Sequence, residues 1–166
     1  MAGSANYTPE ERLMLQLVPF QAGVAVLVSA PSGLIGTVQE TSTLFNSISK
    51  SAAQRYPRNS LIQDLLTGDT QEANKLMRQK IGMYTKDEAA RKQAKQEAIQ
   101  ICRNVAVLLA QKSSPQEAEE YKKWVMDVCT KVASATAEEG QRISPAEEAT
   151  IREIAQALNV TPSFAG

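Results

Sequence analysis

Basic side chains gather in one stretch of the chain, between residues 75 and 95, where Asp87 and Glu88 are the only interspersed acids. Such a run can bind phosphates, nucleic acid or an acidic protein surface. It is equally the composition of a helix face exposed to water. The stretch offers no series of aromatic platforms for unpaired bases, which disfavours nucleic acid as the partner. The candidate interaction residues are Lys75, Arg78, Lys80, Arg91, Lys92 and Lys95.

Side chains suited to nucleophilic or acid–base catalysis are sparse. The chain contains no histidine, which removes serine–histidine and cysteine–histidine pairs and most zinc sites. Cys102 and Cys129 form no CxxC motif, and each lies in an apolar helical pattern. We therefore expect buried thiols, with a disulfide or redox pair as the alternative. Neither phosphate-cradling motif, GxGxxG or GxxxxGK[ST], occurs, and we expect a protein that is not an enzyme.

Capping signals mark the elements that must position these residues. A Ser, Thr or Asp repeatedly stands three residues before a Glu at the start of an apolar-periodic run. In such a capping box the first side chain accepts the third residue's backbone N–H, and the Glu accepts the N–H of the first. Pro9, Pro115 and Pro145 fit the first helical position. The pairs are Thr8/Glu11, Thr37/Glu40, Asp69/Glu72, Thr85/Glu88, Ser114/Glu117 and Ser144/Glu147.

These signals and the apolar period predict an all-α fold, a single-domain antiparallel bundle of about seven or eight helices. We expect a flexible N-terminus at 1–7, one helical domain over 8–160 and a C-terminal tail at 161–166. Pro19 is expected to start a new helix or kink the first one. Asn159 fits a left-handed cap. The predicted helices span residues 9–18, 19 to a stop at 31–33, 38–53, 60–66, 70–84, 86–112, 115–135 and 145–158.

No charged side chain occurs between Arg12 and Glu40. The segment is interrupted by Pro19 and Pro31, so its apolar run falls short of the roughly 20 residues that span a bilayer. We expect a helix buried in a soluble bundle, which disfavours an integral membrane protein and leaves peripheral association open. The N-terminus lacks the basic region of a signal peptide. With no disulfide framework, we expect a cytoplasmic protein.

Two helix–loop–helix units form a weak internal repeat, at residues 24–39 and 132–147. In each, an Ala-rich helix runs into a Gly-containing loop, an Ile follows, and a second helix begins. The second unit continues to Val160. This pattern resembles the tellurite-resistance TerB-like family, in which it occurs twice in an all-helical fold. The resemblance covers residues 125–164 and, more weakly, residues 20–48.

The resemblance implies a divalent-cation site in the second unit. Family members carry acidic residues beside the Gly and at the start of the following helix. Here these are Glu139 and Glu147, with Glu138 and Glu148 adjacent. The first unit lacks both acids, so the implied site is weak, since calcium takes about 6–8 oxygen ligands. The alternative is that Glu147 only caps its helix.

The sequence thus predicts a non-enzymatic, TerB-like, stress-associated binding or scaffold module, with a divalent cation as the only cofactor implied. The alternative is a metal-free protein–protein interaction module that uses the uncharged 13–39 region or the basic 75–95 face. Either reading implies a protein partner, and self-association into a homo-oligomer stays open. A hydrolase or transferase that uses carboxylates is least favoured, because no paired catalytic set is visible.

Overall fold

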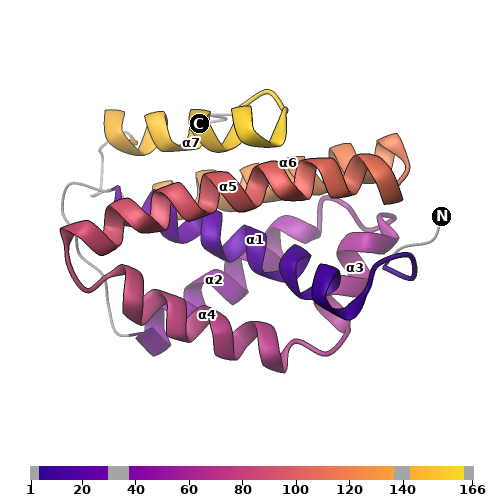
Figure 1. Ribbon diagram of the computed structural model, residues 1–166, viewed down its shortest axis with the longest axis horizontal. Helices are drawn as coiled ribbons and strands as arrows, with labels where there is room; N and C mark the ends of the chain where they lie inside the picture. Colours follow the sequence, from indigo (N-terminus) through magenta and orange to yellow (C-terminus); the bar gives the residue numbers. More distant parts are fainter. Residues whose placement is uncertain (1–3, 30–37, 137–142, 163–166) are drawn as a thin grey trace.

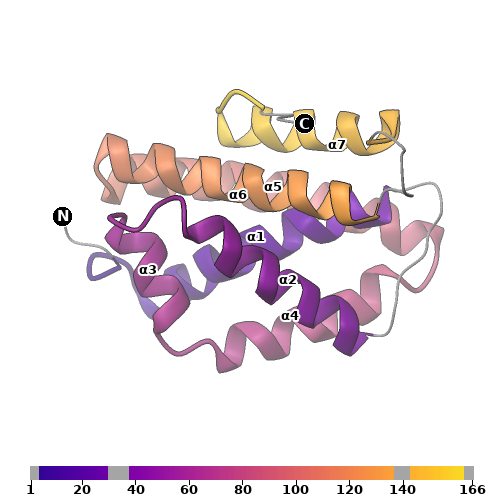
Figure 2. The same cartoon turned by 180° about the vertical axis from the view of Figure 1, so that it is seen from behind.

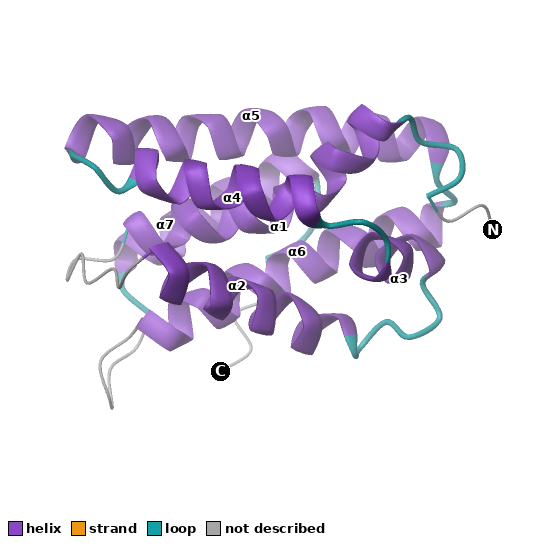
Figure 3. Cartoon of the chain, turned by 90° about the horizontal axis from the view of Figure 1, so that it is seen from below, coloured by secondary structure: helices purple, strands orange, loops and turns teal. Residues whose placement is uncertain are grey.

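The computed structural model describes residues 4–29, 38–136 and 143–162. These residues form seven helices and no strand (Figures 1 and 3), which confirms the all-α prediction. Their bounds are α1 (Pro9–Val28), α2 (Val38–Ala53), α3 (Ser60–Thr67), α4 (Gln71–Tyr84), α5 (Glu88–Lys112), α6 (Pro115–Thr136) and α7 (Pro145–Leu158).

Helix α1 runs through the middle of the bundle (Figures 1 and 2) and contacts all six other helices. In Figure 1, α5 and α6 lie on one side of it, α5 in front and α6 behind, and α7 covers both from outside. On the opposite side lie α2 and α4, and α3 closes one end near the N-terminus. Residues 15–27 of α1 are all buried. Among the described helices, α1 alone is long and apolar enough to cross a membrane. Of its 18-residue apolar stretch, 72% is buried within the bundle.

Helix α1 passes through Pro19 as one continuous helix, so no new helix starts at this residue, which was one of the two expected outcomes. Proline has no N–H, so the carbonyl of Leu15, four residues earlier, loses its helical partner. The Tyr121 hydroxyl of α6 replaces that partner and donates to the Leu15 carbonyl oxygen at 2.6 Å, in the buried interior. The two helices expected on either side of Pro19 are therefore one helix, because a tertiary hydrogen bond substitutes for the local one.

Two of the predicted capping boxes are complete. The Thr8 side chain and Glu11 form one at the start of α1, and Ser144 and Glu147 form the other at the start of α7. Asn159 ends α7 with a φ of 59°, as predicted for a left-handed cap. The Glu117 N–H also donates to Ser114 Oγ at 3.2 Å. The Thr37/Glu40 pair lies partly outside the described residues.

Helices α4 and α5 begin differently from the prediction. Asp87, not Thr85, is the N-cap of α5, and its Oδ1 accepts the Ala90 N–H at 2.8 Å. Thr85 instead donates to the Ile81 carbonyl at 2.7 Å, at the end of α4. At the start of α4, Asp69 Oδ1 accepts the Gln71 N–H at 3.0 Å without forming the expected box.

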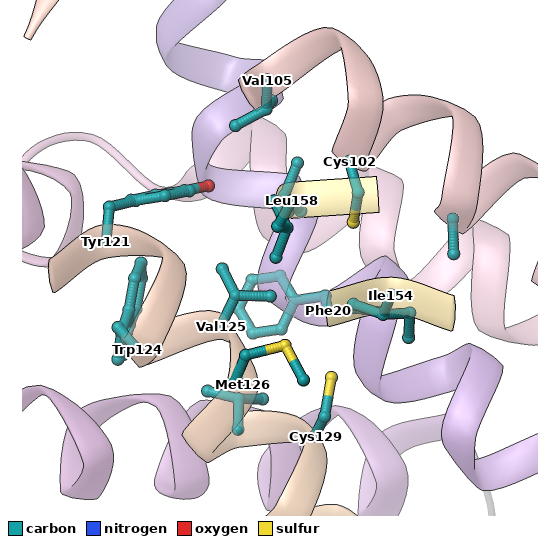
Figure 4. Close-up of a cluster of buried hydrophobic side chains, with 14 of the residues drawn as sticks. Phe20, Cys102, Val105, Tyr121, Trp124, Val125, Met126, Cys129, Ile154 and Leu158 are labelled. Carbon is teal, nitrogen blue, oxygen red and sulfur yellow. The ribbon is translucent and has the colours of Figure 1, made fainter. Parts of the chain in front are cut away.

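The core is one connected set of buried apolar side chains to which all seven described helices contribute. The thiols of Cys102 and Cys129 project into it from α5 and α6 (Figure 4), and both are free and buried. Burial raises the pKa of Cys102 to about 12 and also raises the pKa of Cys129 well above its usual value. The expectation of buried thiols is confirmed.

Residues 4–7, within the N-terminus expected to be flexible, are held against the bundle. The Ser4 N–H and hydroxyl both donate to Asp64 Oδ2 of α3, at 3.0 and 3.2 Å. The Tyr7 hydroxyl lies 2.5 Å from Ser113 Oγ, just past the end of α5. These contacts join residues 4–7 to helix α3 and to the C-terminal end of α5.

Candidate functional site: a groove on α1, α4 and α5

The predicted basic residues are divided between α4 and the first half of α5. Lys75, Arg78 and Lys92 are exposed. Lys95 is paired with Glu153 of α7, with Nζ and Oε2 2.8 Å apart. The Lys80 ammonium lies 5.7 Å from the centre of the Tyr84 ring. The remaining member of the set, Arg91, is half-buried.

The glutamates implied as metal ligands are engaged within the chain where the structure describes them. Glu147 is buried, and its Oε1 accepts both the N–H and the hydroxyl of Ser144, at 3.2 and 2.8 Å. Glu148 pairs with Arg152 at 3.0 Å. Glu138 and Glu139 lie outside the described residues. Within the described part of the chain, no group of three or more Asp, Glu, Cys or His side chains is placed to hold a metal ion.

A groove of about 370 Å³ opens between α1, α4 and α5. Its apolar lining comes from the half-buried Leu13, Met14 and Ile101 and from the buried Leu17. Gln21 also lines it, and the Gln21 Oε1 atom is buried without a hydrogen-bond partner. The polar lining residues are Glu10, Lys80, Glu97, Gln100 and Asn104.

One end of this groove is fixed by a contact between α4 and α5. The Tyr84 hydroxyl donates to Glu97 Oε2, and Gln93 Nε2 donates to Glu97 Oε1 at 3.3 Å. Burial, and then the hydrogen bond to Glu97, raise the pKa of Tyr84 above its ordinary value. The rim therefore has a defined charge, with the Glu97 carboxylate and the Lys80 ammonium beside the neutral Tyr84 hydroxyl.

Sequence reasoning named Lys80 and, within the uncharged 13–39 region, Leu13 and Met14, but it did not single out these two or Ile101 as the lining of a groove. Leu13, Met14 and Ile101 fit the apolar pattern of core positions, and a helical period cannot distinguish a core residue from one that lines an open groove.

A second, more enclosed cavity of about 180 Å³ lies among α1, α2, α3, α4 and α6. It uses Gln16 and Phe20 of α1, whereas the groove uses residues 10, 13, 14, 17 and 21 of that helix. The two hollows therefore occupy different faces of α1.

No known protein family, curated protein or solved structure matches this chain. What is shown is an all-helical bundle, and no family assignment follows from comparison.

Proposed function

We propose that this chain is a non-enzymatic protein-interaction module that holds an amphipathic helix of a partner protein in the α1/α4/α5 groove. The observation that carries the proposal is the apolar lining of the groove. Half-buried Leu13, Met14 and Ile101 meet there in an open depression of about 370 Å³. A helix that lays its apolar stripe into such a depression removes these side chains from water, which is a recurrent mode of peptide recognition.

Charge indicates which helix would fit best. Lys80 is the residue of α4 that lines the groove. An apolar stripe flanked by acidic residues would complement this side. Glu10 and Glu97 on the α1 and α5 sides favour basic residues on the opposite flank. The proposed partner segment is therefore apolar on one face, with an acidic flank toward α4.

The uncharged 13–39 region contributes four residues to this surface, namely Leu13, Met14, Leu17 and Gln21. Most of the described part of that region, residues 15–27, is buried. The proposed surface therefore combines the N-terminal part of that region with residues of α4 and α5.

Synthetic helical peptides test this proposal. A peptide with a leucine stripe and one glutamate flank should shift the methyl NMR signals of Leu13, Met14 and Ile101, and a lysine-flanked peptide should bind more weakly. Reversing charge with Lys80→Glu should remove that preference. Glu119→Lys, an exposed change on α6, is the matched control and should leave binding unchanged. No methyl shift, or equal binding of both peptides, would contradict the proposal.

The TerB-like relationship, and with it a stress-associated role, a cytoplasmic location and a weak cation site, is proposed on the motif at residues 125–164 alone. Thermal unfolding after chelation, with Ca²⁺, Mg²⁺, Mn²⁺ or Zn²⁺ added back, tests the site. A free ion concentration of about 100 times Kd should raise the free energy of unfolding by about 2.7 kcal/mol. The double substitution Glu139→Gln plus Glu147→Gln should abolish this increment. Ser144→Ala, which weakens the α7 cap and keeps both carboxylates, should retain it. An increment that survives in the double variant would exclude the site.

A further inference from the structure

We propose that the second cavity, among α1, α2, α3, α4 and α6, binds a small aromatic carboxylate. The cavity holds about 180 Å³. Its apolar walls include the ring of Phe20 from α1, Leu65 from α3 and Trp124 from α6, all buried. Phe20 and Trp124 both lie in the cluster shown in Figure 4. An aromatic body would be surrounded by rings and aliphatic side chains, which suit its flat apolar faces.

The first polar observation is a buried hydroxyl without a partner. Ser49 of α2 lines the cavity and is 2% exposed, yet its Oγ makes no hydrogen bond within the described structure. Other helical hydroxyls donate to the carbonyl four residues earlier, as Thr67 does to Gln63 and Thr130 to Met126. A hydroxyl buried unpaired is costly, so a ligand atom that bonds Ser49 Oγ would remove an existing penalty.

The second observation is the charge of the lining. Lys50, also on α2, is exposed and is the single charged residue among the described lining residues. The remaining polar residues are uncharged: Gln16, Asn46, Thr70 and Asn74. With a cation near the opening and no carboxylate in the described lining, the cavity favours an anionic group over a cationic one.

The walls of the cavity are fixed by hydrogen bonds. Gln16 Nε2 donates to the carbonyls of Leu65 and Asp69, at 3.0 and 3.1 Å, and so ties α1 to the end of α3. Trp124 Nε1 donates to the Ser49 carbonyl at 3.1 Å and ties α6 to α2. These bonds hold the Trp124 ring and the Ser49 residue in fixed positions, so the site is formed before a ligand arrives.

Size limits the ligand. A dry protein cavity of about 150 Å³ accommodates benzene, and this cavity is slightly larger. One six-membered ring with a single carboxylate therefore fits, with the ring between Phe20, Leu65 and Trp124 and the carboxylate toward Ser49 Oγ and Lys50. Two fused rings with a side chain would exceed the space. Benzoate is the probe that matches these limits.

The chain contains one tryptophan, so Trp124 fluorescence reports on this cavity. Benzoate should change the Trp124 emission and its indole N–H NMR signal in a saturable manner, with a Kd of about 1 mM or tighter. Benzamide, a neutral compound of the same shape, should bind more weakly. An unsaturable response, or equal affinity for the two compounds, would overturn the proposal.

Two substitutions test the assigned residues. Ser49→Ala should weaken benzoate binding by about threefold to tenfold, and Ser47→Ala, an exposed change on the same helix, should not.

Lys50→Met should weaken benzoate binding by about twofold to fivefold and remove the preference over benzamide. Lys123→Met on α6 is its control. Lys50 and Lys123 are exposed, so folding is not at risk. Wild-type affinity in Ser49→Ala or Lys50→Met would overturn the assignment. The peptide groove uses other residues, so the two proposals can fail separately.

Discussion

The carbonyl of Leu15 accepts a hydrogen bond from a side chain instead of from the backbone. Pro19 cannot donate to it, and Tyr121 does so from α6 at 2.6 Å. Both residues are buried, so without this bond the carbonyl would be unpaired away from water, at a cost comparable to that of a lost hydrogen bond. A phenol on one helix therefore permits a proline within another.

The exchange between Pro19 and Tyr121 can be measured. Tyr121→Phe should lower the free energy of unfolding by about 1–3 kcal/mol, because it leaves the Leu15 carbonyl unpaired. Pro19→Ala restores an N–H four residues after Leu15, so Tyr121→Phe should cost less in that background. Urea unfolding of the four proteins in a double-mutant cycle gives the coupling. Simple additivity of the two changes would show that the carbonyl does not link them.

The sequence pattern led us to expect a new helix or a kink at Pro19, because proline cannot donate the helical hydrogen bond. Capping signals and proline effects act between residues a few positions apart, and these predicted the starts of α1 and α7 correctly. The partner that makes Pro19 tolerable stands 106 positions from Leu15. No local pattern in the chain identifies Tyr121 as that donor, because its place in the apolar stripe of α6 is that of an ordinary core residue.

At the scale of elements, Glu117 joins three helix ends. It lies in the first turn of α6 and is 3% exposed. Its Oε2 accepts the hydroxyl of Ser60, the first residue of α3, at 3.0 Å, and its Oε1 accepts that of Ser113, the C-cap of α5, at 3.1 Å. Its own carbonyl accepts the Asn59 side chain at 3.2 Å. One residue thus fixes the relative positions of α3, α5 and α6.

Removing this carboxylate should destabilise the protein. Glu117→Ala leaves the hydroxyls of Ser60 and Ser113 without this acceptor, and we expect a loss of about 1–3 kcal/mol in the free energy of unfolding. The matched control is Glu119→Ala, an exposed glutamate in the same turn, for which a change within about 0.5 kcal/mol is expected. Chemical denaturation measures both. Equal effects of the two substitutions would show that the hydrogen bonds of Glu117 add no net stability.

The sequence indicated this glutamate as a capping residue, and its N–H does donate to Ser114 Oγ. It did not indicate the contacts to α3 and α5, which depend on packing. The start of α5 was placed too early for a local reason, since Thr85 and Asp87 are both acceptable caps and Asp87 is the one used. The number and type of the helices can be predicted from the apolar period and the capping residues. The groove and the cavity depend instead on which helix faces pack against each other.

At the scale of the whole molecule, all the tyrosines respond to the folded state in the same direction. The chain has four, and burial is the main cause of the raised pKa in each. For Tyr56 and Tyr84, hydrogen bonds to Asp127 and Glu97 raise the pKa further. Burial acts in the same way on the thiols of Cys102 and Cys129. The folded protein therefore holds these protons more tightly than the unfolded chain does.

A fall in stability at alkaline pH follows. A group with a raised pKa in the folded state contributes fully below its unfolded-state pKa and loses that contribution as pH rises toward the folded value. The free energy of unfolding should be insensitive to these groups up to about pH 8, fall first as the thiols of the unfolded chain ionise, and fall most steeply above about pH 10, where its tyrosines also ionise. Tyr84→Phe should make this slope shallower by up to about 1.4 kcal/mol per pH unit. Urea unfolding across this range measures it, and a rise in stability above pH 10 would contradict the assignment.

The central place of α1 has a consequence for synthesis on the ribosome. This helix is made before the helices that cover much of it, α5, α6 and α7, which follow from residue 88 onward. Until these helices emerge, the 20 residues of the apolar helix α1 are not fully buried. Their burial requires contacts between residues far apart in the chain, which form slowly. The nascent chain should therefore depend on chaperones during translation, and a ribosome stalled before α5 should present α1 to them.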